Sequence, residues 1–268
     1  LGLLKVDESG IVREFREKPK ERKVLEQFSA PRIIFEQKGL VFNEERCLAS
    51  MGIYVFEREV MLKLLENQKN TDFGKDVIPS ALDEFKVMAY PFGNYWKDIG
   101  TISSFFEANI SLAQEEPPFE LYYPDWPIYT RTRSLPPSRV MQSKIRDSLL
   151  VEGSDIVGAN INNSIIGMRA TVRKGTEFHN VVMMGADFFD GEEEHVDMKK
   201  TKKDVPPLGI GKRCYIENAI IDKNARIGND VIIKSKKNEK DYQGKYFWVR
   251  DGITVIPKGA IIPPGTEL

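Results

Sequence analysis

The sequence has few of the residues on which many metal, redox and membrane functions depend. Of its 268 residues, two are cysteines and two are histidines. Cys47 and Cys214 are far apart and show no metal-ligand or redox spacing, which predicts two free thiols in a reducing compartment. His179 and His195 also lack metal-ligand spacing, which favours surface or packing roles. No apolar run approaches the ~18 residues of a membrane span. The net charge of −1 gives no electrostatic basis for binding nucleic acid or an anionic membrane.

A glycine-rich phosphate-binding loop is also missing from the sequence, and the first residue is Leu1 instead of methionine. Residues 2–12 predict a β-hairpin with its turn at residues 8–10. Because a domain rarely begins inside a sheet, we expect a further segment to precede this chain. A chain that begins internally does not report on signal or transit peptides.

The length predicts one or two domains with a sizeable core. Residues 1–115 have the pattern of a mixed α/β domain, and residues 20–47 are charged and irregular, so no element is assigned there. Residues 116–139 contain Pro117, Pro118, Pro124, Pro127, Pro136 and Pro137, which predicts a connector, because proline blocks helix interiors and central strands. Helices are expected over residues 58–68 and 101–114, and strands over residues 53–56 and 87–90.

From residue 140 to residue 268, apolar residues recur every six positions. A six-residue step is neither helical nor alternating, and it predicts the stacked coils of a parallel β-helix. A β-sandwich of short strands is the alternative. Two charged insertions, Asp187–Pro206 and Ser235–Tyr246, are expected to loop out of the coils. The predicted inward positions are Leu150, Ile156, Ile166, Val172, Phe178, Met184, Ile210, Ile216, Ile221, Ile227, Ile233, Ile256, Ile262 and Leu268.

Residues 96–101, Trp-Lys-Asp-Ile-Gly-Thr, place a single carboxylate on a glycine-containing turn just before a helix. Thr101 has the character of an N-cap. Asp98 on such a turn suits a hard cation, because Mg²⁺ is commonly held by one or two carboxylates together with substrate phosphates. The alternative is that Asp98 only accepts hydrogen bonds from the amides of the turn, as aspartates often do.

Several further motifs occur in a fixed order, and together they carry a family resemblance. The chain resembles the ADP-glucose pyrophosphorylases, also called glucose-1-phosphate adenylyltransferases, over nearly its whole length. The resemblance implies the C-terminal part of a Rossmann-like nucleotidyltransferase domain (α/β), followed by a left-handed parallel β-helix. The motifs are EFREKP at 14–19, ASMGIYVF at 49–56, DFGKDVIP at 72–79, WKDIGT at 96–101, IYT at 128–130, LPPS at 135–138 and IDKNARIG at 221–228.

The activity that this resemblance implies is transfer of AMP from ATP to α-D-glucose 1-phosphate, giving ADP-glucose and pyrophosphate for glycogen or starch synthesis. It also implies Mg²⁺, a homo- or heterotetramer, and a location in the bacterial cytoplasm or the plastid stroma. Three alternatives stay open: a pyrophosphorylase for another sugar nucleotide, a non-catalytic regulatory subunit, and a β-helix assembly module. The family's glycine-rich loop and one metal carboxylate would belong to the preceding segment, so we expect residues 1–268 alone to be inactive.

The resemblance also assigns roles to individual residues. Lys18 and Asp98 would be catalytic, Lys18 by binding the sugar phosphate as a point charge and Asp98 by holding Mg²⁺. Sugar-binding roles fall on Gly2, Glu17, Ser50, Asp72, Phe73 and Trp96. An anionic metabolite would act as allosteric effector through Arg131, Arg133, Lys223 and Lys258.

Overall fold

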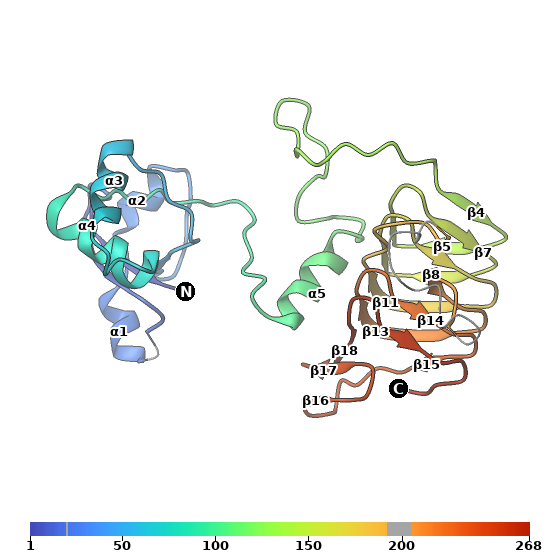
Figure 1. Cartoon of the computed structure of the whole chain (residues 1–268). Helices are drawn as coiled ribbons and strands as arrows, with labels where there is room; N and C mark the ends of the chain where they lie inside the picture. The colour runs from blue at the N-terminus through green and yellow to red at the C-terminus, as the bar shows by residue number, and fades with distance from the viewer. Residues whose placement is uncertain (20, 192–204) are drawn as a thin grey trace. The chain divides into compact units, whose positions relative to one another are not determined.

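The computed structural model describes residues 1–19, 21–191 and 205–268. The chain divides into two compact units, Leu1–Trp96 and Lys97–Leu268. The predicted domain limit at residue 115 differs from this division, because helix α5 (Ile102–Ser111) packs on strands of the second unit. Figure 1 shows α5 beside the stacked coils of that unit.

The first unit contains a small antiparallel sheet in the order β2-β1-β3. The predicted hairpin is confirmed: β1 and β2 pair from Leu3–Arg16 to Val6–Val12, and Gly10 takes a positive φ of 79° in the turn. Val6 and Val12 are buried with Ile34 and neighbouring apolar residues in a local core. The strands are β1 Leu3–Val6, β2 Val12–Arg16 and β3 Leu48–Ala49.

Short helices surround this sheet. The helix predicted from residue 58 is confirmed as α3, although it ends two residues early. Two helices, α1 and α2, lie in the range that was left unassigned, because each is too short to display a helical period. In α4, Pro79 stands in the first turn, where its missing N–H costs no hydrogen bond. The helices are α1 Arg22–Gln27, α2 Arg32–Glu36, α3 Arg58–Glu66, the π-helix η1 Phe73–Val77 and α4 Ile78–Glu84.

The strand predictions for residues 53–56 and 87–90 are wrong. Val55 is 98% exposed, and no strand among the described residues pairs with its segment. The second segment makes one isolated bridge, between Met88 and Ile11. Around that bridge the Val12 N–H donates to the carbonyl of Val87 at 2.8 Å and the Ala89 N–H donates to the carbonyl of Gly10 at 2.9 Å, so the pairing is too short to form a strand.

The second unit confirms the parallel β-helix. Its strands stack coil upon coil in two main sheets, β19-β14-β12-β10-β7-β4 and β16-β17-β18-β13-β11-β8-β5 (Figure 1). None of the described elements falls between α5 and β4, which agrees with a connector there. The strands are β4 Arg139–Met141, β5 Lys144–Arg146, β6 Leu149–Leu150, β7 Asp155–Val157, β8 Asn160–Asn162, β9 Ile165–Ile166, β10 Thr171–Val172, β11 Glu177–Met183, β12 Gly209–Ile210, β13 Tyr215–Ile221, β14 Arg226–Ile227, β15 Ile232–Ile233, β16 Tyr242–Gln243, β17 Trp248–Arg250, β18 Ile253–Ile256 and β19 Ile261–Ile262.

Most of the predicted inward positions form one continuous core, in which Ile156, Val172, Phe178 and Ile216 are fully buried. Met184 is the exception, because Met183 takes the inward place instead. The reason is a five-residue step across three corners at which an asparagine adopts positive φ. These corners are Asn163, Asn180 and Asn218, and the inward pairs that flank them are Ile161/Ile166, Phe178/Met183 and Ile216/Ile221. Leu150 and Leu268 are only partly buried against the core.

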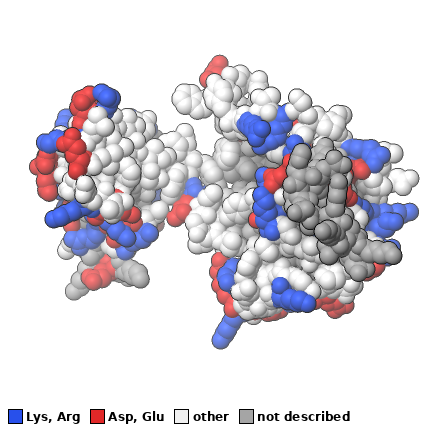
Figure 2. Space-filling model, in the orientation of Figure 1, with Lys and Arg blue, Asp and Glu red and all other residues white. Residues whose placement is uncertain are grey.

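The two insertions differ. Most of Asp187–Pro206, including His195, lies outside the described residues. The Ser235–Tyr246 insertion contains β16, which pairs antiparallel with β17 and so extends the sheet beyond the coils. No described helix has both the length and the apolar character to cross a membrane. Figure 2 shows acidic and basic side chains intermixed on the visible face of each unit, in keeping with the balanced charge.

Candidate functional site

The carboxylate of Glu17 lies in a cradle formed by two glycines. A Cβ atom on Gly2 would lie 2.9 Å from Oε2 of Glu17, and a Cβ on Gly74 would lie 2.8 Å from the same oxygen. Either side chain would therefore push Glu17 out of place. Asp72, which precedes the π-helix, approaches Gly74 from the same side and accepts a 2.8 Å hydrogen bond from the Lys75 N–H.

Lys18 adjoins this cradle in an unusual backbone conformation. Its φ of 45° is in the left-handed region, although the next residue is Pro19. The Lys18 N–H donates to the carbonyl of Leu1 at 3.2 Å, which helps to hold the conformation. The side chain is 74% exposed, and Nζ lies 3.7 Å from Oε1 of Glu17. Strained backbone of this kind often occurs at functional sites, where it fixes the direction of a side chain.

Two aromatic rings, those of Tyr54 and Phe73, and the hydroxyl of Ser50 lie beside the cradle. Tyr54 and Phe73 stack with ring centroids 5.9 Å apart, and the Tyr54 hydroxyl lies 3.0 Å from Oγ of Ser50. The Ser50 N–H donates to the carbonyl of Gly2 at 2.8 Å, so the hydroxyl and the cradle are directly connected. The structure therefore brings together six predicted residues, Gly2, Glu17, Lys18, Ser50, Asp72 and Phe73, and adds Tyr54 and Gly74. Sequence reasoning missed these two, although both lie inside the quoted motifs.

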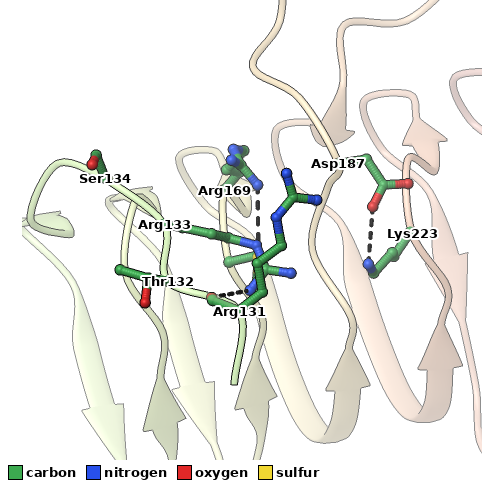
Figure 3. Close-up of a pocket in the computed structure, with 8 residues that line it drawn as sticks. Arg131, Thr132, Arg133, Ser134, Arg169, Asp187 and Lys223 are labelled. Atoms are coloured by element: carbon green, nitrogen blue, oxygen red, sulfur yellow. Dashed lines mark hydrogen bonds and ion pairs between the residues drawn. The ribbon is translucent and has the colours of Figure 1, made fainter. Parts of the chain in front are cut away.

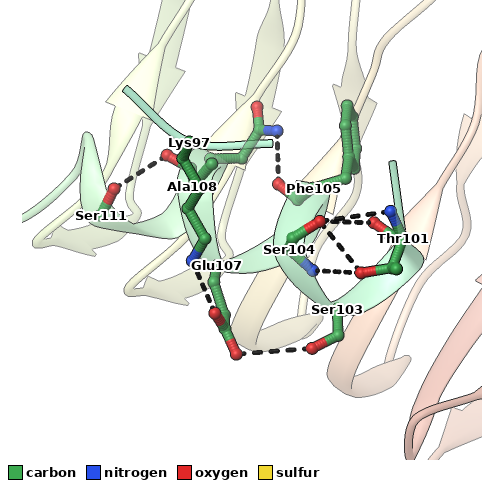
Figure 4. Close-up of polar contacts among 9 residues, drawn as sticks. Lys97, Thr101, Ser103, Ser104, Phe105, Glu107, Ala108 and Ser111 are labelled. Atoms are coloured by element: carbon green, nitrogen blue, oxygen red, sulfur yellow. Dashed lines mark hydrogen bonds and ion pairs between the residues drawn. The ribbon is translucent and has the colours of Figure 1, made fainter. Parts of the chain in front are cut away.

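Asp98 belongs to the second unit and lies on the turn just before α5. Its Oδ1 accepts a 2.9 Å hydrogen bond from the Gly100 N–H, so Asp98 makes the hydrogen bond expected of an aspartate on such a turn. Thr101 forms a capping box with Ser104, and Lys97 pairs with Glu107 at 2.7 Å, which fixes the start of the helix (Figure 4). Trp96, half-buried, ends the first unit.

The fit of Asp98 to Mg²⁺ depends on its oxygens. Asp98 is exposed, and among the described residues only its Oδ1 accepts a hydrogen bond, so Oδ2 is available as a hard ligand. The described residues contain no group of three or more His, Cys, Asp or Glu able to hold a metal. A single carboxylate fits a cation that takes its other ligands from phosphates and water.

A second site is a pocket of about 450 Å³ in the second unit. It contains three of the four predicted effector residues: Arg131, Arg133 and Lys223. Figure 3 shows Lys223, which donates to Oδ1 of Asp187 at 2.9 Å. The fourth residue, Lys258, donates to Oδ2 of the same carboxylate at 2.8 Å. The pocket is lined by Arg131, Thr132, Arg133, Ser134, Met168, Arg169, Asp187 and Lys223.

Family models match both parts of the chain, and the first match extends past Trp96 to include α5. The nucleotidyl transferase family matches residues 1–115, and the GLGC left-handed parallel beta-helix domain matches residues 133–266. The two matches define a sugar-phosphate nucleotidyltransferase architecture with an appended left-handed β-helix. More specifically, the chain belongs to the family of ADP-glucose pyrophosphorylase-like proteins.

Proposed function

We propose that the chain is part of a glucose-1-phosphate adenylyltransferase, which makes ADP-glucose and pyrophosphate from ATP and α-D-glucose 1-phosphate. The convergence of Gly2, Glu17, Ser50 and Phe73, with Lys18 beside them, carries this proposal. The cradle offers a carboxylate acceptor for sugar hydroxyls, a hydroxyl on Ser50 and an aromatic wall for the sugar face. Lys18 offers the positive charge that a sugar phosphate needs.

The chemistry requires positioning and charge stabilisation more than covalent help from the protein. In this proposal Lys18 orients the phosphate of the sugar for in-line attack, and Glu17 fixes the sugar ring. Asp98 would hold Mg²⁺, which when bound supplies positive charge at the crowded phosphates. The pocket lined by Arg131, Arg133 and Lys223, with Lys258 paired to Asp187 at its wall, would bind an anionic effector.

The test is a synthesis assay on the product of the complete reading frame that encodes Leu1–Leu268. Glucose 1-phosphate is supplied with ATP, UTP, CTP, GTP or dTTP, and the sugar nucleotide is identified by mass spectrometry. We expect ADP-glucose, with ATP strongly preferred. Preference for another nucleotide would indicate a different pyrophosphorylase. Inactivity that is relieved only by a second subunit would indicate the regulatory alternative.

A further inference from the structure

The pocket of the second unit has an excess of positive charge. Four of its lining residues are cations, Arg131, Arg133, Arg169 and Lys223, and one is a carboxylate, Asp187. In Figure 3 the three arginines group on one side of the pocket, opposite Asp187 and Lys223. Within the described part of the chain, no ion pair joins any of these arginines to a carboxylate. Arg133 donates to the carbonyl of Arg131 at 3.1 Å, and Arg169 lies near the ring of Phe189.

Asp187 already occupies the lysine side of the pocket as an anion would. Its two oxygens accept from Lys223 and Lys258, and Oδ2 also accepts from Nδ2 of Asn224 at 3.0 Å. The hydrogen bonds from Lys258 and Lys223 hold the pKa of Asp187 well below its usual range. The carboxylate is therefore charged throughout the neutral range, and its side chain remains 37% exposed at the pocket wall.

The backbone of Asp187 is anchored independently of its carboxylate. The Asp187 N–H donates to Oδ1 of Asn224 at 2.8 Å, and the Ala186 N–H donates to the carbonyl of Met168 at 2.8 Å. Rotation of the side chain alone can therefore release both lysines without moving the coil. An incoming anion would therefore have to displace only the Asp187 side chain, and the surrounding loop would not have to unfold.

We propose that Asp187 is an internal competitor for the anion that this pocket binds. In the free protein its carboxylate holds Lys223 and Lys258, and a phosphate group displaces it by presenting more charge and more acceptor oxygens. The arginines on the opposite side then add contacts that Asp187 does not use. The inference rests on the proposed effector role of this pocket, and it adds a built-in threshold that a weak or singly charged anion does not overcome.

The test is calorimetric titration of the protein with inorganic phosphate at constant ionic strength. Asp187→Asn removes the charge but keeps the shape, and Asp222→Asn is the matched control. Asp222 accepts from the Lys223 N–H at 2.6 Å but holds neither ammonium group in the described contacts. We expect Asp187→Asn to bind phosphate about tenfold more tightly. This factor corresponds to one charge-assisted hydrogen bond for which phosphate no longer competes with the Asp187 carboxylate. Asp222→Asn should change the affinity less than Asp187→Asn does, because Asp222 acts on Lys258 only through space, behind the larger effect of Asp187.

Three results would overturn the proposal. Weaker binding by Asp187→Asn would mean that Asp187 organises the lysines instead of blocking them. An equal rise in phosphate affinity in both variants would mean that any nearby negative charge has this effect, and not Asp187 in particular. If no form of the protein binds phosphate, the pocket is not an anion site. Asp187→Ser, which keeps an acceptor for Asn224, provides the same comparison if the first variant does not fold. Phosphate binding requires no turnover, so this result is separate from failure of the proposed enzymatic activity.

Discussion

The side chains of Phe106 in α5 and Val182 in β11 are buried in one apolar cluster, together with Ile220 and Ile253 of the neighbouring coils. The helix that begins just after Asp98 is therefore seated on the β-helix. The strand that carries Val182 continues towards Asp187, and the strand that carries Ile220 continues towards Lys223. Helix α5, which follows the candidate metal ligand Asp98, and the arginine-lined pocket are therefore both attached to these two coils.

Phe106→Ala should destabilise the second unit by about 3–5 kcal/mol, the usual cost of emptying a buried phenylalanine site. Thermal unfolding of the variant would measure the loss. Glu107→Ala on the same helix is the control, because it removes the exposed pair with Lys97 and a 3.4 Å hydrogen bond from the Ser103 hydroxyl, and should cost about 1 kcal/mol or less. Equal stability of both variants would show that α5 is not held by this cluster.

Lys18→Ala should raise the KM for glucose 1-phosphate by orders of magnitude and leave the KM for ATP nearly unchanged. The ammonium group adjoins the Glu17 cradle, and charge-assisted hydrogen bonds to a phosphate contribute about 1.5–3 kcal/mol each. Initial-rate kinetics with each substrate varied in turn would measure the split. Lys5→Ala, on an exposed position of β1, is the control. An equal loss for both substrates would mean that Lys18 has a structural role instead.

The sequence predicts the β-helix better than it predicts the first unit. Each side of a coil buries an apolar residue, so Ile221, Ile227 and Ile233 display the six-residue period directly. The strand predicted at residues 53–56 fails because its pattern requires a neighbouring strand that local sequence does not specify. At the sites, motifs identify Glu17 and Ser50, but Arg169 and Asp187 lie on a corner and at an insertion, where no period or motif marks them.

Asp98→Asn should lower kcat sharply at saturating substrate without unfolding the protein. An amide is a poorer ligand for Mg²⁺ than a carboxylate, whereas it can still accept the hydrogen bond from Gly100 that holds the turn. Activity across a Mg²⁺ titration would measure the loss and any partial recovery at high concentration. Asp125→Asn, exposed in the connector, is the control. A wild-type kcat in Asp98→Asn would assign the metal to other groups.

Lys223→Ala should reduce stimulation by phosphorylated metabolites, because it removes one of the two ammonium groups on the Asp187 side of the pocket. Coupling free energies of about 1–3 kcal/mol are typical of such sites, so we expect the half-saturating activator concentration to rise about 5- to 100-fold. Activator titrations in the synthesis direction, over a panel of glycolytic phosphates, would measure both half-saturation and maximal stimulation. Lys212→Ala is the control, since Lys212 is an exposed β-helix lysine outside the residues that line the pocket. If both variants respond like the unmodified protein, Lys223 is a solvated lysine paired with Asp187, and the effector binds elsewhere.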